Sequence, residues 1–75
     1  MTKAQQKVID HLKTTHQTVV YYRPTDSAWY YPGPIPKENR KRIRSSTFSA
    51  LVLNGHLNMF DKNGDDEYYE VVEVK

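Results

Sequence analysis

The sequence contains no cysteine and only three glycines among its 75 residues. A domain this small in an oxidising compartment usually needs disulfides to support its thin core, so the absence of cysteine favours a reducing compartment. The longest apolar run, Ala50-Leu51-Val52-Leu53, is far too short to cross a bilayer. The first seven residues also contain no apolar segment typical of a signal peptide. We therefore expect a single domain, residues 1–75, that resides in the cytoplasm and not in a membrane.

Sequence patterns of catalysis and of metal binding are also lacking. There is no glycine-rich phosphate loop, nucleophile elbow or pair of carboxylates on a defined scaffold. The three histidines are scattered along the chain, whereas metal ligands need a compact spacing. The acidic run from Asp61 to Asp65 imitates the start of a calcium loop, but Asp66 and Val72 stand where that loop requires glycine and glutamate. The sequence predicts a non-enzymatic binding protein without a cofactor or metal.

Charge is distributed unevenly along the chain. Residues 1–56 carry nine Lys/Arg and three Asp/Glu, whereas residues 57–75 carry two and six. Five of the eleven basic residues lie between Lys37 and Arg44. Because local potential steers association, we expect one end of the molecule to attract anions and the other to repel them.

The first half of the chain predicts a helix followed by a β-hairpin. Thr2 and Gln5 form a capping-box pattern, and apolar residues at helical spacing continue to about Thr14. Residues 18–22 and 28–31 are β-branched and aromatic, as is typical of strands, and Pro24, Asp26 and Ser27 mark a turn between them. Prolines in residues 34–41 favour a loop.

The second half predicts another helix followed by a second hairpin. Ser45 and Ser46 are expected to cap a helix over residues 47–54, which ends at Gly55. Strands over residues 56–60 and 67–74 then flank an Asn63-Gly64 turn. The expected fold is a small α+β domain with the order α-β-β-α-β-β.

The run Arg42-Ile43-Arg44-Ser45-Ser46-Thr47-Phe48-Ser49-Ala50-Leu51-Val52-Leu53-Asn54-Gly55-His56-Leu57, followed by an Asn-Gly hairpin, resembles the second half of a winged-helix domain. The segment Gln5-Gln6-Lys7-Val8-Ile9-Asp10-His11-Leu12 is similar to the first helix of that family. The resemblance implies a recognition helix over Ser46–Asn54, a wing over Phe60–Tyr69 and duplex DNA binding, as in a small bacterial or phage transcriptional regulator. The chain departs from the family in its middle helix, replaced by the aromatic hairpin, and in its acidic wing tip.

On this interpretation the basic loop and the start of the second helix contact DNA. Cationic side chains would contact phosphates, and helix-start hydroxyls and N–H groups would add to them. Short side chains further along the helix would reach the groove with little sequence discrimination. The predicted DNA-binding residues are Lys37, Arg40, Lys41, Arg42, Arg44, Ser45, Ser46, Thr47, Ser49 and Asn54.

Protein binding is the alternative interpretation, with the acidic wing and the aromatic hairpin as contact surfaces. Tyrosine and tryptophan are enriched among binding hot spots. The predicted residues are Trp29, Tyr30, Tyr31, Asp61, Asp65 and Asp66. A homodimer could set the acidic end of one copy against the basic loop of the other. A third interpretation is stacking of single-stranded nucleic acid on the hairpin aromatics. Neighbouring aromatics on a strand point to opposite faces, so one face must either pack on a helix or remain exposed.

Overall fold

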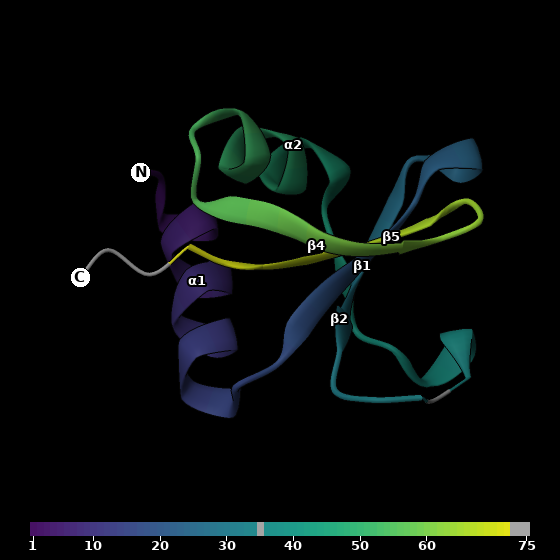
Figure 1. Ribbon diagram of the computed structural model, residues 1–75. Coiled ribbons are helices and arrows are strands. Elements are labelled where there is room, and N and C mark those ends of the chain that lie inside the picture. Colours follow the sequence, from purple (N-terminus) through teal and green to yellow (C-terminus); the bar gives the residue numbers. More distant parts are fainter. Residues whose placement is uncertain (35, 73–75) are drawn as a thin grey trace.

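The computed structural model describes residues 1–34 and 36–72, without the side chain of Lys37. The described chain is a single α+β domain of two helices and a five-stranded antiparallel sheet with strand order β3-β2-β1-β5-β4 (Figure 1). Both helices contribute to the core on one face of this sheet. The elements are α1 (Lys3–Thr15), β1 (Thr18–Tyr22), β2 (Ser27–Tyr31), β3 (Arg42–Ile43), α2 (Ser45–Leu53), β4 (Leu57–Asn63) and β5 (Asp66–Val71), with 3-10 turns at Arg23–Thr25 and Lys37–Asn39.

Helix α1 forms where the capping pattern and the apolar spacing predicted it. The Gln5 amide donates to Thr2 Oγ1 at 3.2 Å, and the helix ends at His16, which takes the left-handed conformation with φ 55°. The helix buries Val8, Ile9 and Leu12. Local signals alone are therefore sufficient to define this element.

Replacing Thr2 by alanine is expected to lower the free energy of unfolding by about 1 kcal/mol, because the Gln5 amide loses its acceptor. Urea unfolding followed by far-UV circular dichroism measures the loss. Thr14→Ala makes the same chemical change at an exposed position of the same helix and should cost almost nothing. Equal losses in the two variants would contradict a capping role for Thr2.

The first hairpin also follows the sequence prediction. Strand β1 spans the predicted residues, and β2 begins one residue early, at Ser27. Asp26 takes the left-handed conformation with φ 51°, and its Oδ1 accepts a hydrogen bond from the Tyr21 hydroxyl at 2.6 Å. Pro24 and the small polar residues that follow it thus form a tight turn in the expected place.

The start of α2 differs from the prediction. Ser45 is already helical, and Arg44 is the N-cap residue, with no side-chain capping hydrogen bond. The expectation that Ser45 and Ser46 cap this helix is therefore wrong. Arg42 and Ile43 pair with β2 as the short strand β3, and this pairing carries extended backbone up to residue 44, so the helix starts immediately afterwards.

Glycines shape the second hairpin. Gly55, with φ 76°, follows the end of α2, and Gly64, with φ 62°, lies in the turn between the paired residues Asn63 and Asp66. Strand β5 covers Asp66–Val71; the end of the predicted strand, residues 73 and 74, lies outside the described residues. Strand β4, which forms one edge of the sheet, has a bulge between Met59 and Asp61.

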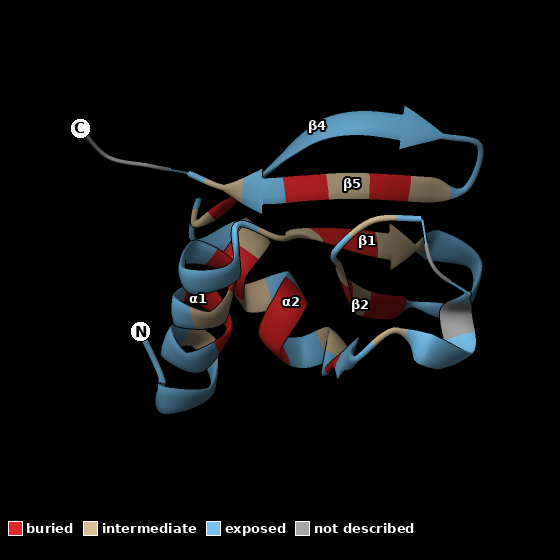
Figure 2. Ribbon diagram, turned by 90° about the horizontal axis from the view of Figure 1, so that it is seen from below, coloured by how far each residue is buried: buried red, intermediate tan, exposed pale blue. Residues whose placement is uncertain are grey.

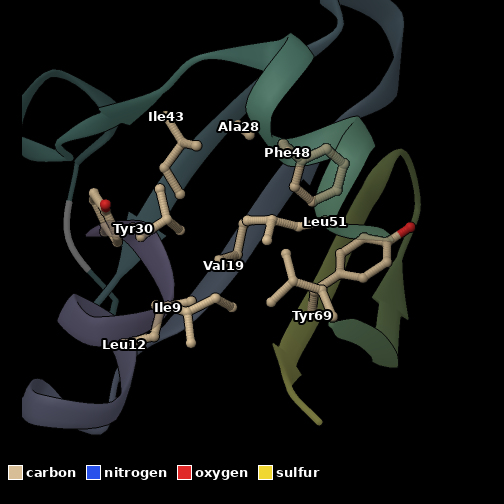
Figure 3. Close-up of a cluster of buried hydrophobic side chains, with 11 residues drawn as sticks. Ile9, Leu12, Val19, Ala28, Tyr30, Ile43, Phe48, Leu51 and Tyr69 are labelled. Atoms are coloured by element: carbon tan, nitrogen blue, oxygen red, sulfur yellow. The ribbon is translucent and has the colours of Figure 1, made fainter. Parts of the chain in front are cut away.

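The core lies between the two helices and one face of the sheet. Figure 3 shows Phe48 and Leu51 of α2 pointing toward Val19 of β1 and Tyr69 of β5. The Phe48 ring stacks on Tyr21 with a centroid distance of 4.7 Å and meets Tyr69 edge-on at 5.0 Å. The inner sides of α1 and α2 are buried, whereas most of β4 is exposed (Figure 2).

Candidate nucleic-acid interface and the open face of the sheet

Residues 40–44, which we call the basic segment, contribute to two surfaces. Arg42 pairs in register with Trp29, and its guanidinium donates to Ser27 Oγ at 3.4 Å. Arg40 lies over Tyr31, with 5.1 Å between its guanidinium carbon and the ring centroid. Lys41, Arg42 and Arg44 also line a groove beside α1. The basic segment therefore contributes to the aromatic face of the sheet through Arg40 and Arg42, and to the groove through Lys41, Arg42 and Arg44.

The groove between α1 and the β3–α2 junction is lined by four basic residues, Lys7, Lys41, Arg42 and Arg44. It has a volume of about 250 Å³ and is lined by residues far apart in the sequence. Its described lining contains no acidic residue. The lining residues are Ala4, Lys7, Val8, His11, Tyr30, Lys41, Arg42, Ile43, Arg44 and Thr47.

Lys7 is the groove residue that the sequence prediction missed. It is exposed on α1 and is absent from the predicted DNA-binding residues. No local signal places it beside Lys41, because the approach of α1 to β3 depends on both elements packing onto the same core. His11 is held at the groove by a 3.2 Å hydrogen bond to the Gln17 side chain and by a 4.3 Å ring contact with Tyr30.

The predicted α2 contact residues are not equally accessible. Ser46, Ser49 and Asn54 are exposed and Ser45 is half-buried. Thr47 is 9% exposed and belongs to the lining of the groove. The predicted phosphate contact at Lys37 involves a side chain outside the described part of the structure.

The second face of the sheet, which we call the open face, carries aromatic side chains with neither helix packed on it. Strand alternation and the β4 bulge place Tyr22, Trp29, Tyr31, Phe60 and Tyr68 on this face. Tyr68 lies 5.4 Å from Tyr31 and 6.4 Å from Phe60 between ring centroids. A hollow of about 440 Å³ opens beside these three rings.

The open face brings together most of the residues predicted for protein binding. Trp29, Tyr31, Asp61 and Asp66 occupy it, and Asp65 is exposed in the turn at its end. Tyr30 is the exception, because it points into the core and is 8% exposed (Figure 3). Tyr30 therefore belongs to the packing of the fold, with its remaining exposed surface in the basic groove.

The hairpin of β4 and β5, which we call the acidic hairpin, and the basic segment lie at opposite edges of the sheet. β4 forms one edge and β3 the other, so three strands separate them. At a strand spacing of about 4.8 Å, this places the two edges about 19 Å apart. The charge asymmetry of the sequence is thus a separation of charge across the molecule.

Two further properties concern the described residues only. Residues 1–34 and 36–72 contain no group of three or more His, Cys, Asp or Glu arranged to hold a metal ion. Neither α1 nor α2 is long and apolar enough to cross a membrane.

Comparison with known proteins identifies no family model, curated protein or solved structure that matches this chain.

Proposed function

We propose that this protein binds duplex DNA through its basic groove and acts as a small regulator of transcription. The observation that carries the proposal is the convergence of Lys7 with Lys41 and Arg44 on one groove whose described lining has no carboxylate. A phosphate backbone lying along this groove would meet four cations from two separate parts of the chain, Lys7 of α1 and Lys41, Arg42 and Arg44 around β3. Such contacts release counterions from DNA and supply affinity that does not depend on sequence.

Sequence discrimination by this interface is expected to be weak. The exposed polar side chains of the α2 region are Ser46, Ser49 and Asn54, and of these only asparagine makes a bidentate contact with a base edge. The proposal includes a winged-helix arrangement with α2 as recognition helix, which the glycine-ended helix followed by the β4–β5 hairpin supports. The acidic hairpin lies at the sheet edge opposite β3, so its carboxylates would stay away from the phosphates.

Removing two groove cations by Lys7→Ala and Arg44→Ala is expected to weaken duplex binding about tenfold or more at low salt. It should also flatten the plot of log affinity against log salt by about 1.8, which corresponds to about 0.9 for each lost phosphate contact. Fluorescence anisotropy of a labelled mixed-sequence duplex between about 50 and 200 mM salt measures both quantities. Both residues are exposed, so the fold should be retained.

The matched control is Lys13→Ala with Lys62→Ala, which removes the same charge from exposed positions outside the groove. A long-range effect of net charge would weaken both double variants equally, and the groove assignment would then be rejected. Unchanged affinity and salt slope in the Lys7/Arg44 variant would reject DNA binding at this groove outright.

A further inference from the structure

The hollow on the open face is walled by three aromatic rings that come from three different strands. Tyr31 belongs to β2, Phe60 to β4 and Tyr68 to β5, and all three line the same space of about 440 Å³. The ring planes of Tyr31 and Tyr68 are turned 61° from each other, and those of Phe60 and Tyr68 are turned 48°. Rings at such angles form a concave wall and not a flat stack, so a small group in the hollow can contact more than one ring.

The segment between β2 and β3 crosses part of this face but does not fill the hollow. Arg40 of that segment lies over Tyr31, with 5.1 Å between its guanidinium carbon and the ring centroid, and it is not among the residues that line the hollow. Phe60 is 49% exposed, and Tyr31 and Tyr68 are half-buried. Because the face of an aromatic ring carries negative potential, it attracts cations, and the position of Arg40 is an example within this ring cluster.

Carboxylates add negative charge at the same place. Asp61 lines the hollow and pairs in register with Tyr68, so the two side chains share a face. Asp66 pairs with Asn63, another lining residue, and its Oδ1 is buried without a hydrogen-bond partner among the described residues. Burial raises the pKa of Tyr68, and the nearby charges of Asp66 and Asp61 raise it further, whereas that of Arg40 lowers it. Both carboxylates therefore act on the central ring of the wall.

Lys62 is the cationic residue that lines the hollow, and its register directs its side chain elsewhere. It pairs with Glu67, whose carboxylate accepts from the Tyr69 hydroxyl on the helix side of the sheet. Residues directly opposite each other share a face, so the Lys62 side chain lies on the helix side with Glu67. The charged group that shares the open face with the three rings at this point of β4 is the carboxylate of Asp61.

An angled aromatic wall beside a carboxylate is suited to a methylated ammonium group. Such a group spreads its positive charge over methyl groups that contact ring faces, and it is attracted within about 6 Å of a ring centroid. Neighbouring centroids are 5.4 and 6.4 Å apart, so one cation can come within that distance of two rings together. A volume of about 440 Å³ also lies in the range of small-molecule sites. A phosphate-bearing ligand would instead be repelled by Asp61 and Asp66.

We propose that the hollow between Tyr31, Phe60 and Tyr68 binds a quaternary ammonium group, with Asp61 as its counter-charge. The group is supplied either by a small molecule such as choline or by a trimethylated lysine side chain, which present the same chemistry. The hollow and the basic groove have no lining residue in common, so this site does not depend on whether the groove binds DNA.

An amide NMR titration of the isotope-labelled full chain tests the proposal. Choline should cause saturable shifts around the three rings, with a dissociation constant on the order of millimolar. The alcohol 3,3-dimethylbutan-1-ol has the shape of choline without its charge and should bind at least tenfold more weakly. A Gly/Ser peptide with one trimethyllysine should bind more tightly than the same peptide with lysine, because an unmodified ammonium is strongly hydrated. The tighter of choline and the trimethyllysine peptide identifies the source of the group.

Two variants test the assigned residues. Phe60→Ala removes one exposed ring, and Asp61→Asn removes the charge while keeping an oxygen for the Lys62 amide, which donates to Asp61 Oδ1 at 2.8 Å. Each should weaken choline binding about three- to tenfold and leave far-UV circular dichroism unchanged. The matched control is Asp65→Asn, which removes the same charge from the exposed turn of the same hairpin and should change affinity less than about twofold.

Three results would overturn the proposal. The first is the absence of saturable shifts with about 30 mM choline and with about 5 mM trimethyllysine peptide. The second is equal binding of choline and its uncharged analogue, which would mean that the hollow recognises apolar shape alone. The third is unchanged affinity in Phe60→Ala, or equal weakening by Asp61→Asn and Asp65→Asn, because neither result is compatible with a cation held between these rings and Asp61.

Discussion

Replacing Phe48 by alanine is expected to lower the free energy of unfolding by about 3–5 kcal/mol, the usual range for deleting a buried phenyl ring. Phe48 is 4% exposed and lies between the rings of Tyr21 and Tyr69, so the variant loses two aromatic contacts and leaves a cavity. At about 0.05–0.15 kcal/mol per residue, a chain of this length is stable by only about 4–11 kcal/mol. The loss therefore removes at least about a quarter of the total stability, and all of it at the lower end of that range.

Leu53→Ala is the control for this experiment, because Leu53 belongs to the same helix and is 86% exposed. Its loss should stay within about 0.5 kcal/mol. Urea titrations of both variants and the wild type, followed by circular dichroism, give the comparison. Similar losses at the two positions would mean that α2 does not pack through the face that carries Phe48.

The second large effect is expected at Glu67, a carboxylate that is only 2% exposed. It accepts hydrogen bonds from Arg23 Nε at 2.7 Å and from the Tyr69 hydroxyl at 2.8 Å. Burial alone would raise the pKa of Glu67, but hydrogen bonds from Tyr69 and Arg23, with the charge of Arg23, outweigh burial and lower it. Burial raises the pKa of Tyr69 to about 12, so its phenol stays protonated and continues to donate.

A lowered folded-state pKa means that Glu67 stabilises the fold fully above its ordinary pKa of 4.5 and that this contribution is lost as pH falls below it. A single group changes the unfolding free energy by at most about 1.4 kcal/mol per pH unit. Glu67→Gln should remove this acid-dependent component. At pH 7 it should also cost about 1–3 kcal/mol, chiefly through the buried hydrogen bond from Tyr69.

Urea unfolding of the wild type and Glu67→Gln between about pH 3 and pH 7 measures both effects. Glu70→Gln, at an exposed position of the same strand, should retain the wild-type pH profile. If Glu67→Gln keeps the full loss of stability in acid, other carboxylates cause that loss and the role assigned to Glu67 is incorrect.

Local sequence signals determined the elements whose geometry depends on neighbouring residues. Thr2 caps α1, Asp26 turns the first hairpin, and Gly55 and Gly64 supply the positive φ angles after α2 and in the second hairpin. Caps, turns and glycine conformations involve interactions over a few residues, so a sequence pattern is sufficient to predict them. The start of α2 was mispredicted because pairing between Arg42 and Trp29, residues distant in the chain, extends the backbone to Arg44.

Composition also identified the basic segment and the acidic hairpin, but their surroundings are decided by tertiary structure. Pairing of β3 with β2 sets Arg42 beside Ser27, and packing of α1 brings Lys7 to the groove that Lys41 and Arg42 also line. The pairing of β1 with both β2 and β5 aligns Arg42, Trp29, Val20, Tyr68 and Asp61 in one row. By itself, the sequence determined which charges and rings this protein has and where its turns lie. Only the sheet order and register decided which of them lie together on one face, because strand pairing joins residues that no local interaction connects.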